Sequence, residues 1–303
     1  MLAIFKKELH TYFNTLSGYI FLGFFVLINA YFFSNFNIGG GIPTYANTLM
    51  YTLSMFLILI PVMTMRLFAE ETRQKTDQLL YTSPVSIGKI VLGKFFAAAA
   101  LFLIGLIIIA VFPLILSYYG DVPFAETFGC FLGYFLLGSS LISVGLFISV
   151  LTDNQIVAAV GTFAAVFFFL MMDGIIESMP MDTMSSLLFV ACVIFFIAFI
   201  LYNGTKSVPL SAAVFGVGLV AEACLYLYDS NFFELAVKDG FHLYNSSIFD
   251  GIIVKVLNWF SVLNRFESFY MGVFKLSDIV YYISFITVFL YITVNTIEKR
   301  RWK

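Results

Sequence analysis

The residues whose types could support catalysis or metal binding are few and widely separated in this sequence. His10 and His242 are the only two histidines, which excludes a metal site built from several histidine ligands. We expect His10 to be an interfacial side chain. The cysteines each lie within an apolar run and form no C-x-x-C pair, which favours small packing residues over a disulfide or metal site: Cys130, Cys192 and Cys224.

Sequence motifs for phosphate binding and for hydrolysis are also missing. The chain has no G-x-x-x-x-G-K-[ST] motif, so it has no P-loop that could hold ATP. The glycines at 39–41 follow no predicted strand, and we interpret them as an extracellular turn. Neither H-E-x-x-H nor G-x-S-x-G occurs. We therefore expect a protein that is not an enzyme and that binds no metal.

The composition indicates a chain that is solvated largely by lipid. Hydrophobic residues make up 61% of the sequence, charged residues only 11%, and the mean hydropathy is +0.98. Soluble domains carry roughly 25% charged residues because their surfaces face water. The sequence therefore predicts an all-α polytopic membrane protein, since only helices or closed barrels satisfy every backbone polar group inside a bilayer.

Apolar runs of about 20 residues predict eight transmembrane helices. We place them at 17–36, 46–67, 95–118, 124–150, 156–177, 185–202, 208–228 and 277–297. The sixth and seventh are separated by a short turn and could instead be shallow interfacial helices. Six and eight spans both stay open.

Lysine and arginine set the expected orientation. With the N-terminus inside, the cytoplasmic segments hold 12 of the 16 basic residues: 1–16, 66–94, 151–155, 203–207 and 298–303. Positive loops favour the cytoplasmic side. We therefore expect both termini in the cytoplasm, with either six or eight spans.

The first 16 residues predict an amphipathic helix that lies along the inner leaflet. Apolar residues recur there at helical spacing, while basic residues lie elsewhere around the helix. Such a helix would place its bases among anionic head groups. The interface residues expected are Leu2, Phe5, Lys6, Lys7, Leu9 and Phe13.

The segment between the second and third spans is much longer than a hairpin between helices requires. It begins as a helix in which Glu71 and Lys75 are spaced to form an i, i+4 ion pair. Ser83 and Pro84 then suit the cap and first position of a new helix. We expect that short helix, about Pro84 to Lys94, to run along the membrane before the third span begins.

Two further features are candidates for a pathway or a gate. Glu222 lies deepest in a predicted span, and a charge at that depth is costly, so it either lines a pathway or has a structural role. The segment 229–276 lies outside and is amphipathic, with Trp259 and Phe260 among its aromatic residues. It is either a re-entrant element or an interfacial cap.

One stretch of the long loop resembles a known family signature. The run 70–86 is similar to the cytoplasmic signature of ABC-2-type transporter permeases, E-E-[RK]-R-x-G-T-x-E-x-L-x-x-x-P-[VL]-[ST]. Lys75 stands where that family usually has glycine, and Gln78 where it usually has glutamate. The matching residues are Glu70, Glu71, Arg73, Thr76, Leu79, Leu80, Pro84, Val85 and Ser86.

Both ends of the chain add to the resemblance. The start, 4–9 with Phe13, resembles the amphipathic interface helix of the family, and 272–302 resembles the end of the gliding-motility Gld-type permeases. The region 178–245 departs from the six-span plan, so the chain looks like a six-span core with an extra helix pair. The resemblance implies one permease domain over 1–303, with the interface helix at 1–16, the coupling loop at 69–94 and, within the outer segment 229–276, a re-entrant gate at 246–272.

The resemblance also implies a function. It is that of a multi-pass exporter subunit in the plasma (inner) membrane of a prokaryote, which works as a homodimer or heterodimer. ATP and Mg²⁺ would bind to separate ABC ATPase subunits, with no cofactor on this chain. The helix after Pro84 would be the coupling helix that docks on the ATPase, and the matching residues of the signature would serve that coupling. A Gld-like auxiliary protein with an extracytoplasmic domain is a further implied partner, and no nucleic acid is expected.

Two alternative functions remain open from the sequence. The first is an ATP-independent carrier or channel, and the second is a membrane anchor for a surface or motility complex. The sequence does not choose a substrate.

Overall fold

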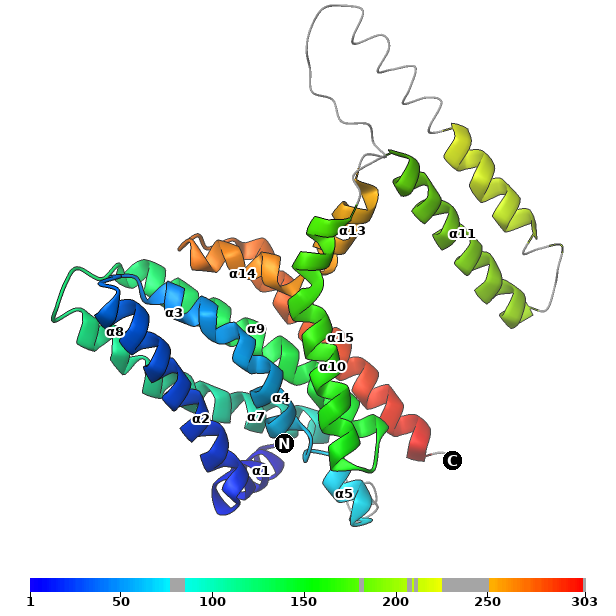
Figure 1. Cartoon of the computed structure of the whole chain (residues 1–303). Coiled ribbons are helices and arrows are strands. Elements are labelled where there is room, and N and C mark those ends of the chain that lie inside the picture. Colours follow the sequence, from blue (N-terminus) through cyan, green and yellow to red (C-terminus); the bar gives the residue numbers. More distant parts are fainter. Residues whose placement is uncertain (77–84, 180–182, 206–208, 210–211, 225–250, 302–303) are drawn as a thin grey trace, which may run out of the picture. The chain divides into compact units, whose positions relative to one another are not determined.

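The computed structural model describes residues 1–76, 85–179, 183–205, 209, 212–224 and 251–301. Within these residues all regular structure is helical (Figure 1). The chain forms two compact units. The first unit comprises Met1–Met171 and Val262–Lys303, and the second comprises Met172–Ser261. Each unit is described by itself.

Six helices in the described residues are long and apolar enough to cross a membrane. They are Leu16–Gly39, Tyr45–Arg73, Ile87–Leu116, Phe124–Leu151, Gln155–Ser178 and Leu276–Arg300. They fall where the first five and the eighth spans were predicted, which confirms a multi-pass helical membrane protein. Two shorter apolar helices, Ser185–Phe196 and Ala212–Cys224, lie where the sixth and seventh were expected. The count of eight spans stays a prediction.

The first unit begins with two helices joined at a sharp corner. Helix α1 spans Leu2–Asn14, and α2 spans Leu16–Phe32 before the π-helical segment η1 (Phe33–Gly39). Between them Thr15 is extended, with φ −107° and ψ 156°. This single extended residue ends α1, so that α1 and the first span are separate helices, as the sequence predicted.

The second span is built from short pieces rather than one continuous α-helix. These are α3 (Tyr45–Thr52), the 3₁₀ turn η2 (Leu53–Met55), α4 (Phe56–Thr64) and α5 (Ala69–Arg73). Pro61 lies inside α4 and has no N–H to donate. The hydroxyl of Ser149 accepts hydrogen bonds from the backbone N–H groups of Phe68 and Ala69, at 3.1 and 3.2 Å. These bonds satisfy donors at the start of α5, which has no preceding helical carbonyls of its own.

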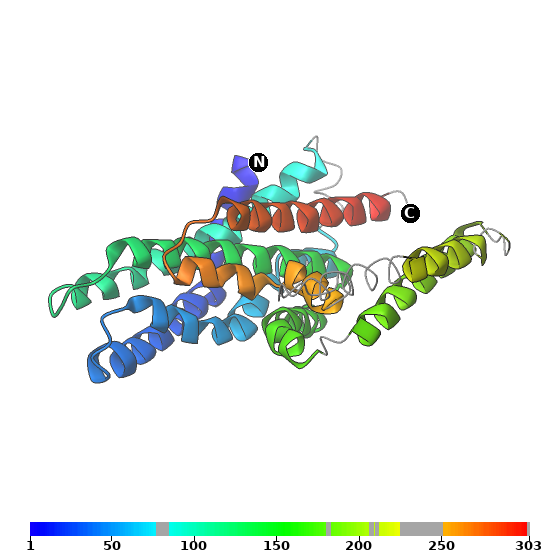
Figure 2. The same cartoon turned by 90° about the horizontal axis from the view of Figure 1, so that it is seen from above.

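Helix α9 (Phe124–Leu151) is the centre of the first unit. It packs against α3, α4, α7 (Ile87–Ile109), α14 (Val262–Tyr270) and α15 (Leu276–Arg301), and α15 lies along it in both Figure 1 and Figure 2. Gly138 permits the approach of α7, because a Cβ there would lie 2.3 Å from Cε1 of Phe102. The short helix α8 (Val111–Leu116) continues from α7.

Buried aromatic rings fill the space around α9. Tyr134 lies at their centre, with ring centroids 4.7 Å from Phe56, 6.0 Å from Phe102 and 6.3 Å from Phe266. Its hydroxyl lies 3.2 Å from Oγ1 of Thr52, which satisfies a polar atom that water does not reach. This core fixes the second, third and fourth spans relative to one another.

The predicted boundary of the third span at Lys94 is wrong. Ser86 is extended, with φ −65° and ψ 143°, and α7 then runs without a break from Ile87 to Ile109. A separate membrane-surface helix ending at Lys94 is therefore not present in the described part of this segment. The sequence prediction treated the charge of Lys94 as a mark of the water boundary. In the folded protein, carboxylates neutralise the charge of Lys94.

The second unit contains helical segments on either side of undescribed residues. The end of α10 (Gln155–Ser178) is followed by α11 (Thr183–Thr205), the helix at 212–224 and α13 (Ile252–Phe260). The rings of Phe195 and Phe215 pack edge to face with centroids 5.9 Å apart, which joins α11 to the helix at 212–224. The described part of the predicted gate 246–272 contains two short helices, α13 in this unit and α14 in the first, and its position in the bilayer stays a prediction.

Candidate functional site

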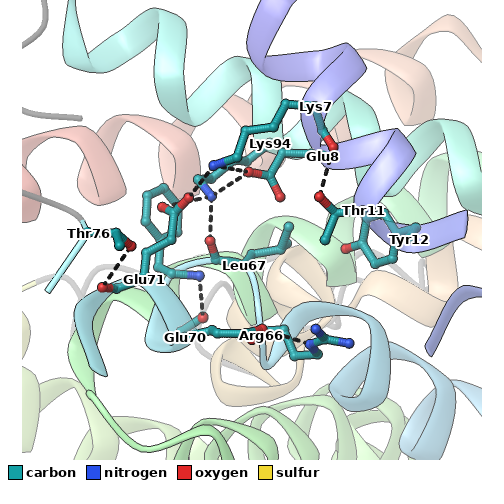
Figure 3. A network of polar contacts seen from close by, with 12 residues as sticks. Lys7, Glu8, Thr11, Tyr12, Arg66, Leu67, Glu70, Glu71, Thr76 and Lys94 are labelled. Carbon is teal, nitrogen blue, oxygen red and sulfur yellow. Dashed lines mark hydrogen bonds and ion pairs between the residues drawn. The ribbon is translucent and has the colours of Figure 1, made fainter. Parts of the chain in front are cut away.

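Charged side chains of the first unit gather where α1, α5 and the start of α7 meet (Figure 3). They line a polar cavity of about 290 Å³ together with Thr11, Tyr12 and Ser17. Within the described residues no group of three or more His, Cys, Asp or Glu side chains is placed to hold a metal ion. The charged side chains of the site form a network of ion pairs.

Lys94 is the centre of this network. Its side chain is only 1% exposed, and its Nζ lies 2.9 Å from Oε1 of Glu8 in α1 and 2.9 Å from Oε2 of Glu71 in α5. It also donates a hydrogen bond of 2.6 Å to the carbonyl of Leu67 (Figure 3). Two of the three N–H donors of the ammonium group form hydrogen bonds, to Glu8 and Leu67, and its contact with Glu71 is an ion pair. Lys94 thus joins three separate parts of the chain.

Lys7 adds a second link between α1 and α5. Its Nζ lies 3.0 Å from Oε1 of Glu71 and 3.7 Å from Oε1 of Glu8. Partial burial alone would lower the pKa of Lys7, but the neighbouring carboxylates of Glu71 and Glu8 outweigh it and raise that pKa above its ordinary value. Lys7 therefore stays charged at neutral pH. The two lysines and two glutamates balance in charge.

Charge balance matters here because Lys94, Glu8 and Glu71 are shielded from water. Moving an ion out of water costs several kcal/mol, and only close pairing with full hydrogen bonding offsets that cost. The ring of Phe68 adds a cation–π contact, with its centroid 5.0 Å from Nζ of Lys94. A cation at this position is stable only while its carboxylate partners remain in place.

Helix α1 places Glu8 in the network because one of its faces packs on α7. Glu8 and Tyr12, one turn apart, are the two buried residues of α1. The hydroxyl of Tyr12 donates to the carbonyl of Met63 at 2.8 Å. Gly93 lets the two helices approach, because a Cβ there would lie 3.0 Å from Cγ2 of Ile4. These contacts hold α1 against the bundle at the level of Lys94.

The predicted interface residues surround this buried face of α1. Leu2, Lys6 and Lys7 are exposed, whereas Phe5, Leu9 and Phe13 are half-buried. Their contact with the inner leaflet stays a prediction, since the structure contains no membrane.

A second ion pair lies beside the network but within one stretch of chain. Nε of Arg66 lies 2.8 Å from Oε2 of Glu70, one helical turn later, and its NH1 donates to Oγ of Ser17 at 3.0 Å. Both side chains are partly exposed, at 24% and 29%. This pair ties the turn before α5 to the start of α2 and does not involve α1.

The predicted coupling residues divide into three groups. Glu70 and Glu71 are partly buried in ion pairs, whereas Arg73 and Thr76 are exposed at the end of α5. Val85 is half-buried, and Ser86 is exposed just before α7. Leu79, Leu80 and Pro84 lie outside the described residues.

The predicted ion pair between Glu71 and Lys75 is wrong. Helix α5 ends at Arg73, and Lys75 adopts φ +56°, so the i, i+4 helical spacing is lost. Both carboxylate oxygens of Glu71 point instead to lysines of other helices, Lys7 and Lys94.

The candidate pathway residues lie in the second unit. Glu222 is 8% exposed, and Trp259 and Phe260 are 61% and 48% exposed, with their rings edge to face at 5.0 Å. Their roles in a pathway or gate stay predictions.

Sequence reasoning missed Lys94 and Glu8 as site residues. Lys94 was assigned to a cytoplasmic loop, although it stands in a run that is apolar on both sides, from Ile90 to Ala100. A single cation inside such a run indicates a buried partner. Glu8 lies one turn before Tyr12 and beside the predicted apolar stripe, and that placement could have indicated the partner.

Comparison with known proteins agrees with the helical architecture. A search of curated proteins gave no match. The model of the ABC-2 family transporter protein matches residues 28–228, more than half of the chain, and this range includes Glu71 and Lys94. The chain therefore belongs to the ABC-2 family of transporter proteins, as a membrane-spanning permease subunit of an ABC transporter.

Proposed function

We propose that this chain forms the translocation pathway of an ATP-driven exporter, as a dimer coupled to separate ATPase subunits. ATP and Mg²⁺ would bind to those subunits, and this chain would contribute helices and a docking segment. Membership of the ABC-2 family supports an association with an ATPase and with the bilayer. The proposed location is the plasma membrane of a prokaryote, with both termini in the cytoplasm.

The observation that carries the proposal is the buried ionic network at the start of the long loop. A loop that merely connects two spans needs no buried charges, which are expensive to desolvate. Here Glu71, in the last helix before the loop, is bound by Lys7 of α1 and by Lys94 of α7. The segment 74–86 thus begins from an anchored position, which suits a segment that receives force from a partner.

The proposed docking segment consists of the exposed end of α5 and the residues that lead into α7. Arg73 and Thr76 are exposed at its start, and Ser86 is exposed at its end. Leu79, Leu80 and Pro84 carry the resemblance to the family signature between these two points. We propose that apolar residues here insert into a groove of the ATPase.

Co-purification tests this assignment. The tagged chain is extracted in mild detergent from cells that produce it at native levels, and the bound ATPase is identified by mass spectrometry and by Mg²⁺-dependent ATP hydrolysis. Leu80→Asp is expected to reduce the retained ATPase strongly. Asp153→Asn, in the exposed connection between α9 and α10, is the control and is expected to retain it.

Full retention of the ATPase after residues 78–84 are replaced by glycine and serine would overturn the docking assignment. Transport of substrate by the purified chain alone in liposomes, driven by an ion gradient, would favour an ATP-independent carrier. An outer gate at 246–272 and a Gld-like auxiliary partner are further parts of this proposal. Inhibition of export by cross-linking α14 to α9 would support the gate.

A further inference from the structure

We infer that Lys94 is a positioning residue that couples α1 to the start of the proposed docking segment, so that the two move together. The inference rests on the proposed function and goes beyond it, because the resemblance assigned no role to Lys94 or Glu8. Its basis is the convergence on one buried Nζ of Glu8 from α1, Glu71 from α5 and the carbonyl of Leu67.

The buried contacts of Lys94 resist exchange of partners. Lys94 is 1% exposed, and its three partners are each within 2.9 Å. Departure of a carboxylate would leave the buried ammonium unpaired, which is strongly unfavourable. A displacement of Glu71 is therefore transmitted to Lys94 and Glu8 rather than absorbed by a rearranged ion pair.

The other described ion pair between α1 and α5 is more exposed. Lys7 also reaches Glu71, but its side chain is 57% exposed, and an exposed ion pair contributes little. Tyr12 binds Met63 in α4, ahead of the turn that leads into α5. Lys94 is thus the buried group in the described network through which α1, α5 and α7 are joined.

The carboxylate of Glu71 points toward other helices of the same chain. Its resemblance to the family signature suggested a residue that faces the ATPase. In the structure its carboxylate is turned toward α1 and α7, and the side chain is 14% exposed. Recognition of a partner then falls to exposed neighbours such as Arg73 and Thr76, while Glu71 transmits their movement to α1.

A fluorescent reporter on α1 tests the inference in the complex with the ATPase. His10 is exposed on α1 and accepts a cysteine, and the exposed Cys192 and Cys224 are replaced by serine so that only position 10 is labelled. The buried Cys130 is retained. An environment-sensitive fluorophore at position 10 is expected to respond to Mg-ATP with vanadate, because closure of the ATPase subunits would displace α1.

Lys94→Met removes the charge while keeping an unbranched side chain of similar length. The expected result is loss of the fluorescence response with the ATPase still bound. Lys94→Arg, which keeps the charge, is expected to retain the response, and so is Asp153→Asn, which removes an exposed ion pair with Arg300. An undiminished response in the Lys94→Met complex would overturn the inference, as would a parent complex that binds the ATPase and gives no response.

Two further measurements keep the test decisive. If Lys94→Met does not assemble, the variant Glu8→Gln/Glu71→Gln/Lys94→Met leaves no unpaired buried charge and is judged by the same two outcomes.

If no ATPase binds the parent chain, the proposed function fails. The inference is then judged by hydrogen exchange of the chain alone, in which Lys94→Met should speed exchange across Leu2–Asn14 and leave the middle of α9 unchanged. Unchanged exchange in α1 would overturn it.

Discussion

Glu8 and Lys94 are 86 residues apart in the sequence, yet their side chains form a buried ion pair of 2.9 Å. The pair joins a helix that lies outside the predicted spans to the first third of a spanning helix. Because the same ammonium also binds Glu71, the contact is one side of a three-way junction. The stability and the mechanics of the molecule at this end both depend on it.

Removal of the Lys94 charge should destabilise the folded chain substantially. Lys94→Met leaves two buried carboxylates without their common cation, and loss of one partner from a buried pair costs about 3–5 kcal/mol. The measurement is the free energy of unfolding in detergent, followed by circular dichroism. Lys89→Met, at an exposed site in the first turn of the same helix, is the matched control and should change it by about 0.5 kcal/mol or less. Equal effects of the two variants would contradict the burial of Lys94.

The two glutamates should not be equivalent. Glu71 is bound by both lysines, at 3.0 and 2.9 Å, whereas the close partner of Glu8 is Lys94 alone. Glu71→Gln should therefore lower the unfolding midpoint more than Glu8→Gln. A double-mutant cycle on Glu8 and Lys94 should give an interaction energy of about 0.5–3 kcal/mol. An interaction energy near zero would show that the pair contributes nothing to stability.

The contribution of Lys7 to stability should be lost in strongly alkaline solution. Its pKa in the folded chain is raised above the ordinary value of 10.5 by the carboxylates of Glu71 and Glu8, which outweigh the opposing effect of burial. The ion pair then stabilises the fold fully below the unfolded pKa, and this stabilisation is lost as the pH rises through the folded pKa. The difference in unfolding midpoint between the parent and Lys7→Met should be constant from about pH 7 to 9 and should shrink in stronger base. A difference that already shrinks near neutral pH would refute the assignment.

A buried acid outside the Lys94 network should hold α14 against α15 in the first unit. Oδ1 of Asp278 lies 3.1 Å from NH1 of Arg265, and the Asp278 side chain is 2% exposed. Asp278→Asn weakens this attraction, so backbone amides of Val262–Tyr270 should exchange with solvent faster. Glu267→Gln, at an exposed position of the same helix, provides the comparison and should leave exchange unchanged. The two variants can be compared directly by mass spectrometry.

The spans were predictable because their signal is local. Runs of about 20 apolar residues place the helices within a few positions, and no long-range information is needed. The same reasoning failed at Lys94, where a charge was taken as the end of the apolar run. A hydropathy pattern cannot indicate that Glu8, 86 residues away, neutralises that charge.

The site was only partly predictable for a related reason. Resemblance to the family signature identified Glu71, but the signature does not show the direction of a side chain. The predicted pair with Lys75 assumed that the helix continued, whereas α5 ends at Arg73. Helix boundaries depend on tertiary contacts such as those at the start of α5, where two N–H groups bind Ser149 in α9, and such contacts are not visible in local sequence.

Lys75, which the resemblance placed at a glycine position of the family signature, adopts φ +56°, a conformation that favours glycine. A left-handed backbone conformation costs a residue with a side chain roughly 1–2 kcal/mol relative to glycine. Lys75→Gly should therefore relieve strain in the folded chain, although the added freedom of the unfolded chain offsets part of the gain. The chain turns at Lys75 despite that cost. The turn that follows α5 is therefore favoured by contacts within this protein and needs no other subunit to form.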